Sequence, residues 1–198
     1  MKYTKVLENI STGKMNRSEL QALRVNALSK FKTGDDDAMA VLSAIDVARP
    51  SDTYILFMGF CPDADVNNRL DIEWKTTGVC RFDYHQSKVQ VERFNRICTG
   101  DLVVLKKREK IGETMKLYGH GRVRGIDYDH ENVRFLNMNW SNQSDVIEVP
   151  LMGCNYTVDI KSMETVEQEM PKEFFAWLGC QILSHERTGQ DTPAARAA

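Results

Sequence analysis

The spacing of apolar residues changes near residue 50, and this change limits the fold more than any other feature of the sequence. Asn16 and Glu19 form a capping-box pattern that opens a helix. Gly34 breaks this helix, and Pro50 marks the end of a second one. Apolar residues of the first helix recur at helical spacing at Leu20, Leu23, Ala27, Leu28 and Phe31. We therefore expect a two-helix appendage within residues 1–50.

From Asp52 onward the apolar residues alternate or form short runs rich in β-formers, as strands do. Helical spacing returns only at 88–97 and after Pro171. Many short strands with few helices predict an α+β fold, a small mixed β-barrel with flanking helices. We expect this domain to span residues 51–184, followed by a flexible tail at 185–198. Strands are expected at 53–60, 69–75, 79–84, 101–106, 115–129, 132–140, 146–150 and 156–160.

Composition excludes several classes of protein. The 198 residues carry a formal net charge of -2, which argues against a protein that coats nucleic acid indiscriminately. Five cysteines without a Cys-x-x-Cys pair favour a reducing compartment, and no histidine pairs with a cysteine at zinc-finger spacing. The sequence has neither an apolar leader nor a membrane-length apolar run. We expect a cytoplasmic protein with no cofactor, no metal and no membrane contact.

Positive charge is concentrated between residues 106 and 124, a segment that contains seven lysines and arginines but only two carboxylates. Such a patch is typical of a phosphate-binding surface. The alternative is an ordinary edge strand, because lysines are also common on strand edges that face solvent. In the run 119–125, period two places the three glycines on one face and His120, Arg122 and Arg124 on the other. The expected phosphate-binding residues are Lys106, Arg108, Lys110, Lys116, His120, Arg122 and Arg124.

The same region resembles EVE-type domains of the PUA-like superfamily, which include modified-base readers of restriction systems. The resemblance lies in a turn of the form (I/V)xxGDxVxxxK, then a Gly-x-Gly-x-Val strand, then a strand that ends in tryptophan. These positions are Ile97, Gly100, Asp101, Val103, Lys106, Gly119, Gly121, Val123 and Trp140. The resemblance implies a PUA-like barrel that binds nucleic acid, with DNA favoured over RNA. It also implies a partner chain with nuclease or NTPase activity.

A reader of this kind grips one extruded base between aromatic rings, with polar groups at the base edge. The expected aromatic walls are Trp74, Trp140, Phe82 and Tyr84, and the expected edge readers are Asn139, Asn142 and Asp83. Taken singly, each of these aromatic residues is more often an ordinary core residue than a pocket wall, and Trp177, beside Phe174 and Phe175, is expected to be a core residue.

Two alternatives remain open from the sequence. Asp63, Glu73 and Lys75 follow the PD-(D/E)xK pattern of Mg²⁺-dependent nucleases, in which both carboxylates would hold the metal. That pattern is short, and the strand-like segment after Lys75 does not fit the helix that such a nuclease requires. The second alternative is a non-catalytic interaction protein that oligomerises through residues 16–49. The sequence does not indicate the oligomeric state or the base that is read.

Overall fold

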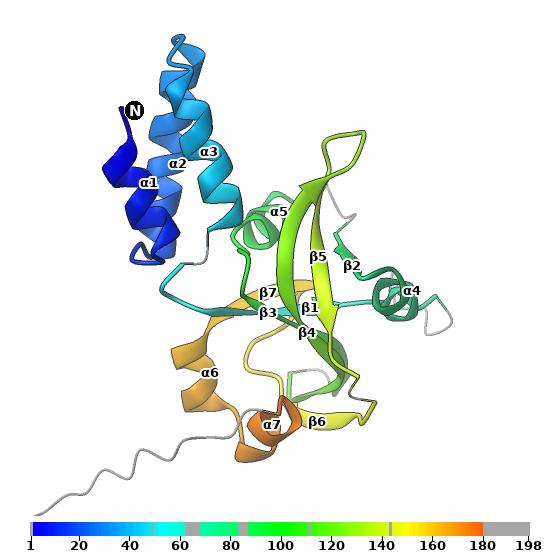
Figure 1. Cartoon of the computed structure of the whole chain (residues 1–198). Helices are drawn as coiled ribbons and strands as arrows, with labels where there is room; N and C mark the ends of the chain where they lie inside the picture. The colour runs from blue at the N-terminus through cyan, green and yellow to red at the C-terminus, as the bar shows by residue number, and fades with distance from the viewer. Residues whose placement is uncertain are drawn as a thin grey trace, which may run out of the picture.

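The computed structural model describes residues 2–48, 50–61, 68–82, 87–110, 112–142 and 144–179, which form a mixed α+β fold (Figure 1). The helices are α1 (Thr4–Ser11), α2 (Arg17–Lys32), α3 (Asp37–Val47), α4 (Leu70–Thr77), α5 (Lys88–Asn95), α6 (Met163–Glu169) and α7 (Lys172–Trp177). The strands are β1 (Tyr54–Gly59), β2 (Val79–Arg81), β3 (Leu102–Lys110), β4 (Thr114–Tyr128), β5 (Arg134–Trp140), β6 (Ile147–Pro150) and β7 (Val158–Ser162).

All seven of these strands belong to one sheet, in the order β2-β5-β4-β3-β1-β7, with β6 paired to β4. Only β1 and β3 pair in parallel, and the other pairs are antiparallel. Within the described ranges no hydrogen bonds join the edge strands β2 and β7. The α+β class is therefore confirmed, but the sheet is not closed into a barrel by hydrogen bonds.

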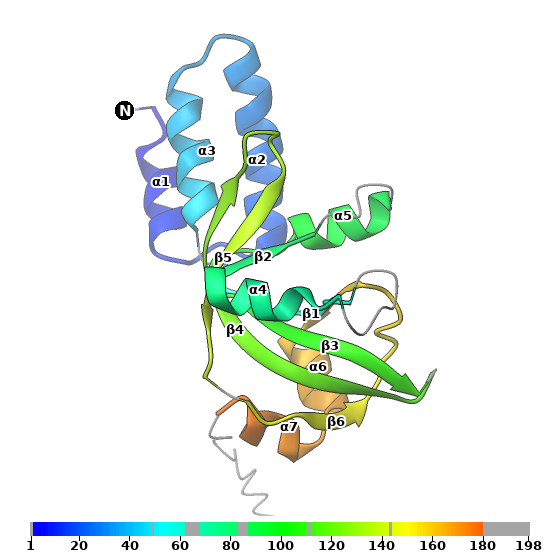
Figure 2. The same cartoon turned by 90° about the vertical axis from the view of Figure 1, so that its right-hand side faces the viewer.

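Both faces of the sheet are covered, which explains why β1 and β3 read as continuous apolar runs. Along β1, Leu56 and Met58 join one hydrophobic cluster, and Ile55 and Phe57 join another on the opposite face. The first cluster lies under α4 and α5 and includes Trp74 and Phe94. The second lies under α6 and α7, which Figure 2 shows at the opposite end of the molecule from the N-terminal helices.

The N-terminal appendage is a bundle of three helices, not two, because residues 4–11 also form a helix (Figures 1 and 2). The bundle has its own hydrophobic cluster, in which Leu20 of α2 meets Val41 and Ile45 of α3. The capping box is confirmed: the side chain of Asn16 accepts from the backbone N of Glu19, and the Glu19 carboxylate accepts from the backbone N of Asn16. Two of the apolar positions expected to pack, Leu28 and Phe31, are exposed.

Residues 70–77 form the helix α4, so the strand expected at 69–75 is wrong. Leu70 and Trp74 lie four residues apart and both pack on the sheet, whereas Ile72 between them is exposed. Gly78 ends the helix in the left-handed conformation that glycine adopts most easily. Seven residues are too few to separate the period of a helix from that of a strand when apolar positions are this sparse.

One buried ion pair joins the helical bundle to the sheet. The Nη2 atom of Arg17, the first residue of α2, lies 2.7 and 2.8 Å from the two carboxylate oxygens of Asp101. Asp101 also accepts hydrogen bonds from the backbone N of Cys98 and of Tyr54. The Arg17 guanidinium lies 4.4 Å from the centre of the Tyr54 ring and donates to the carbonyl of Arg96. Arg17 thus fixes the bundle against the turn that precedes β3.

We expect Arg17→Ala to lower the free energy of unfolding by about 3–5 kcal/mol, because it leaves the Asp101 carboxylate buried without its cation. Urea denaturation followed by circular dichroism measures this loss. The matched control is Lys32→Ala at the exposed end of the same helix, which should change stability by less than about 0.5 kcal/mol. Equal losses for the two variants would contradict the role of the ion pair. Arg17→Leu combined with Asp101→Asn should recover part of the loss.

Candidate nucleic-acid interface

A large hollow lies where the helical bundle meets the sheet. Its volume is about 1030 Å³, and α2, α3, α5 and the β4–β5 hairpin all contribute to its lining. We call it the helix–hairpin cleft. Figures 1 and 2 show the hairpin extending from the sheet beside the three N-terminal helices. No single element forms the cleft, because each wall comes from a different part of the chain.

Four aromatic residues line the helix–hairpin cleft: Tyr54, Phe82, Phe94 and Tyr128. Phe82 and Phe94 are buried, with ring centres 5.9 Å apart, and belong to the cluster beneath α5. Tyr128 near the end of β4 is 48% exposed. The lining of the cleft thus includes two buried aromatic rings in contact with each other and the solvent-accessible ring of Tyr128. Of the aromatic wall predicted from sequence, Phe82 lies here, while Tyr84 and the edge reader Asp83 lie outside the described residues.

Four arginines also line the cleft: Arg17, Arg24, Arg96 and Arg134. Arg17 is paired with Asp101, and Arg24 is paired with Asp46. Arg134 donates to the carbonyls of Phe94 and Ile97 rather than to a carboxylate, and burial lowers its pKa. Arg96 is exposed, with its guanidinium 5.7 Å from the centre of the Tyr54 ring. Among the described residues, the Arg17 Nε atom has no hydrogen-bond partner. The four arginines outnumber the two carboxylates of the lining, Asp46 and Glu92, so the cleft carries an excess of positive charge.

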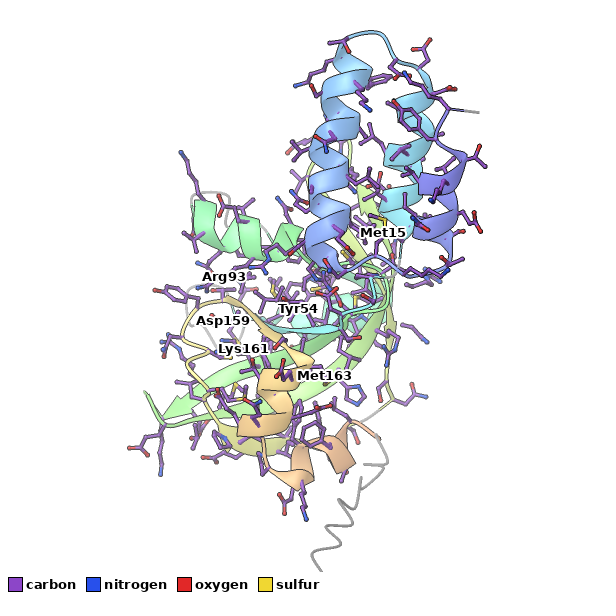
Figure 3. The ribbon with its side chains drawn as sticks, turned by 90° about the vertical axis from the view of Figure 1, so that its left-hand side faces the viewer. Met15, Tyr54, Arg93, Asp159, Lys161 and Met163 are labelled. Atoms are coloured by element: carbon purple, nitrogen blue, oxygen red, sulfur yellow. The ribbon has the colours of Figure 1, made fainter. Side chains whose placement is uncertain are left out.

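A network on the sheet holds α5 against the cleft. Arg93 of α5 donates to Asp159 of β7 at 2.8 Å, and Lys106 of β3 lies 2.9 Å from the other carboxylate oxygen. Figure 3 shows Arg93 and Asp159 close together, below the helical bundle. Gln90 of α5 also accepts from the backbone N of Val158. The cleft wall formed by α5 is thus tied to the edge strand β7.

A second, smaller hollow of about 600 Å³ lies beside the end of α4. Four of its lining residues can bind a ligand through charge, an aromatic ring or an amide: Lys75, Arg124, Trp140 and Asn142. We call it the tryptophan hollow. It brings together Trp140 and Asn142, predicted as pocket residues, and Arg124, predicted as a phosphate ligand. None of its lining residues is acidic.

Two glycines of β4 make room for the side chains at this hollow. A Cβ atom on Gly121 would lie 2.7 Å from Cε3 of Trp140 and 2.9 Å from the carbonyl oxygen of Asn139. A Cβ atom on Gly119 would lie 2.7 Å from Nζ of Lys75. The bare face predicted from the glycine repeat therefore accommodates an indole ring and an ammonium group of the same chain.

Trp74 does not form a pocket wall, which corrects the predicted pair of tryptophans. Its side chain is only 3% exposed and packs in the cluster beneath α4 and α5. It meets Trp140 through its backbone, since the Trp140 Nε1 atom donates to the Trp74 carbonyl at 2.8 Å. The two rings therefore do not form a slot. Asn139 is exposed and lines neither hollow.

The predicted row of phosphate-binding cations is broken, because two members are buried. Lys106 is 3% exposed, and its ammonium group donates to Asp159 and to the carbonyls of Cys154 and Tyr156. His120 is buried, with its ring 4.8 Å from that of Trp177. A register shift between Val123 and Gly125 then separates Arg124 from Arg122. The row is broken because α7 covers His120, because Asp159 of β7 binds Lys106, and because a bulge displaces Arg124, and none of these can be read from the spacing of residues along one strand.

The remaining members of the row do not gather at one site. Arg108 and Lys110 are exposed near the end of β3, and Lys116 is paired with Glu109 at 2.9 Å. Arg122 is exposed and donates to the carbonyl of Gly100 at 2.7 Å. None of these four residues lines either hollow.

The nuclease pattern does not keep the geometry that its chemistry requires. Glu73 and Lys75 lie on the helix α4, two residues apart, so they do not share the face of a strand. The Lys75 ammonium group donates to the carbonyl of Tyr118 at 2.7 Å. Asp63 lies outside the described residues. Within the described ranges, no group of three His, Cys, Asp or Glu side chains is placed to hold a metal ion.

Sequence reasoning missed most of the helix–hairpin cleft. Its arginines come from α2, from the end of α5 and from β5, and nothing in their local spacing links them. Tyr54 begins an apolar strand, and Tyr128 ends a long one, so neither stands out as a ligand residue. Among the described helices, none is long and apolar enough to cross a bilayer. Comparisons with protein-family models, curated proteins and solved structures found no match to this chain.

We expect Gly121→Ala to lower the free energy of unfolding by about 1–3 kcal/mol, since the new methyl group would overlap the Trp140 ring and the backbone of Asn139. Gly125→Ala on the same strand is the matched control, because nothing lies within 4 Å of its Cβ position. Thermal unfolding of both variants measures the difference. A larger loss for Gly125→Ala would show that Trp140 does not depend on Gly121.

We expect His120 to make the protein less stable in mild acid. Burial against Trp177 lowers the pKa of His120 below its ordinary value of 6.5, so the folded state keeps the ring neutral. The unfolded chain binds a proton first as the pH falls below that value, and stability is lost as the pH falls toward the folded pKa. His120→Gln should therefore show a smaller loss of stability than the parent between about pH 7 and pH 5. Urea denaturation across this range measures it, and identical pH profiles would contradict the assignment.

Proposed function

We propose that this protein is a nucleic-acid-binding module that takes one extruded base, a modified base in DNA, into the helix–hairpin cleft. The observation that carries the proposal is the meeting of four aromatic rings and four arginines around one hollow of about 1030 Å³. Pockets that bind compact ligands commonly have this size, with a mostly apolar lining and a few placed polar groups.

The aromatic part of the cleft suits a base. Stacking on an aromatic side chain is worth about 1–3 kcal/mol per base and tolerates modified rings. Tyr128 is the solvent-accessible ring, whereas the rings of Phe82 and Phe94 are buried and pack against each other in the wall of the cleft. Arg134 adjoins Phe94, its guanidinium 5.7 Å from the ring centre. A flat ring that enters the cleft thus meets a lining that contains both aromatic rings and arginines.

The charged part of the cleft suits the sugar–phosphate backbone next to that base. Arg96 is exposed and has no ion pair among the described residues, so its charge is open to a phosphate. Arg17 and Arg24 are paired and contribute mainly to the shape of the wall. This division explains how a chain of net charge -2 can hold an anion at one place.

We also propose that the fold is an open variant of the PUA-like, EVE-like barrel. The motif positions that carry the resemblance have structural roles in this chain: Gly100 has a φ of 96°, Asp101 accepts from Arg17, and Lys106 holds Asp159. Domains of that kind act as specificity modules, so we propose a partner chain with nuclease or NTPase activity. In this proposal the module selects the site, and the partner performs the chemistry.

We expect Tyr128→Ala to weaken binding of an oligonucleotide that carries a modified base by about 5- to 150-fold, the loss of one stacking contact. Tyr128→Phe keeps the ring and should keep most of the affinity. Fluorescence anisotropy with labelled duplex and single-stranded oligonucleotides, unmodified or methylated at cytosine or adenine, measures this. Equal weakening by both variants, or no binding at low salt, would overturn the proposal.

We expect Arg96→Ala to lower the slope of log affinity against log salt concentration by about one, since one phosphate contact is lost. Arg108→Ala is the matched control, an exposed arginine on β3 that does not line the cleft. The same anisotropy titrations at several salt concentrations give both slopes. A change for Arg108→Ala without a change for Arg96→Ala would place the nucleic-acid backbone on β3 and contradict the cleft.

A further inference from the structure

The tryptophan hollow is separate from the cleft assigned to the base. The two hollows share no lining residue. They border the same hydrophobic cluster at different places: the cleft through Phe82 and Phe94, the tryptophan hollow through Met138 and Trp140. The proposed function does not use the tryptophan hollow.

Within the described part of the chain, neither Lys75 nor Arg124, the two cations of the tryptophan hollow, forms an ion pair with a carboxylate. Lys75 is half-buried, and its ammonium group donates to the Tyr118 carbonyl. Asp71, the nearest acidic residue toward the start of α4 on the same side, is bound through both oxygens by Arg69. Burial lowers the pKa of Lys75, and the charge of Asp71 opposes this shift only in part. Arg124 lines the hollow as an exposed residue. An anion bound in the hollow would supply a counter-charge.

Trp140 presents a fixed aromatic surface to the same hollow. Its Nε1 atom is held by the Trp74 carbonyl at 2.8 Å, and its ring lies against the backbone of Gly121. The indole is half-buried, in contrast to the buried Trp74 and Trp177. Because its position is fixed before a ligand arrives, stacking on it costs little conformational entropy.

Neutral polar groups complete the lining. Asn142 and Ser144 are exposed at the rim, and both can donate and accept hydrogen bonds. Thr76 and Thr77 use their hydroxyl hydrogens on helical carbonyls of α4, which leaves their oxygens as acceptors. The hollow therefore combines two cations, one aromatic ring, an amide and hydroxyl groups, and none of its lining residues is acidic.

We propose that the tryptophan hollow is a second ligand site, which binds a nucleoside phosphate. The exposed Arg124 binds the phosphate, Lys75 adds positive charge from the wall of the hollow, and the base packs against the exposed part of Trp140. A volume of about 600 Å³ accommodates such a ligand. The ligand is either a free nucleotide or one nucleotide of a strand, since the recognised chemistry is the same.

The test is a titration of intrinsic tryptophan fluorescence with a nucleoside monophosphate, with the nucleoside and with inorganic phosphate. Trp74 is 3% and Trp177 is 6% exposed, so Trp140 should give the response, and Trp140→Phe should abolish it. We expect saturable quenching by the monophosphate and at least fivefold weaker binding by the nucleoside and in Arg124→Ala. Arg108→Ala, an exposed arginine away from the hollow, should bind as the parent does.

No saturable response below about 10 mM monophosphate, or equal weakening by Arg124→Ala and Arg108→Ala, would overturn the proposal. A thermal-shift titration with the same ligands gives a second readout, because a ligand that binds the folded state raises the melting temperature. Tyr128→Ala should leave the response unchanged, which separates this site from the cleft. A short single-stranded oligonucleotide that binds more tightly than the monophosphate would identify a strand as the source, and equal affinity would identify a free nucleotide.

Discussion

The ion pair between Arg17 and Asp101 is the interaction on which the shape of this protein depends. Asp101 accepts from the first residue of α2, from the turn before β3 and from the first residue of β1. One buried carboxylate therefore fixes three segments that are distant in the sequence. Because a charge removed from water must be paired closely, the two residues specify one orientation of the helical bundle. Without that orientation, the helix–hairpin cleft would lose the wall formed by α2 and α3.

The cations of the chain divide into structural and accessible groups, and this division determines where a ligand can bind. Lys106, Arg17 and Arg93 hold buried or partly buried carboxylates, and Arg134 holds backbone carbonyls. Arg96 in the cleft and Arg124 in the tryptophan hollow are exposed. Positive charge in the sequence is concentrated at 106–124, but only Arg124 of the exposed cations there lines one of the two hollows, and Arg96 lies outside that region.

The glycine repeat of β4 links packing to the second of these hollows. Gly119 and Gly121 allow Lys75 and Trp140 to reach the strand backbone, so an ammonium group and an indole ring converge beside α4. The cleft and the hollow both border the hydrophobic cluster beneath α4 and α5. A ligand at either site would thus contact side chains whose positions the core already fixes, which favours binding without a large rearrangement.

Local sequence determined the elements whose signals are short-range. The capping box at Asn16, the β-rich runs of β1 and β3 and the helix after Pro171 all follow from spacing and turn chemistry. Tertiary structure decided which residues meet. It buried Lys106 against Asp159, made 70–77 a helix and gathered arginines of α2, α5 and β5 at one cleft. Period and propensity describe neighbours along the chain, whereas a site depends on register, bulges and ion pairs between segments that only the folded chain brings together.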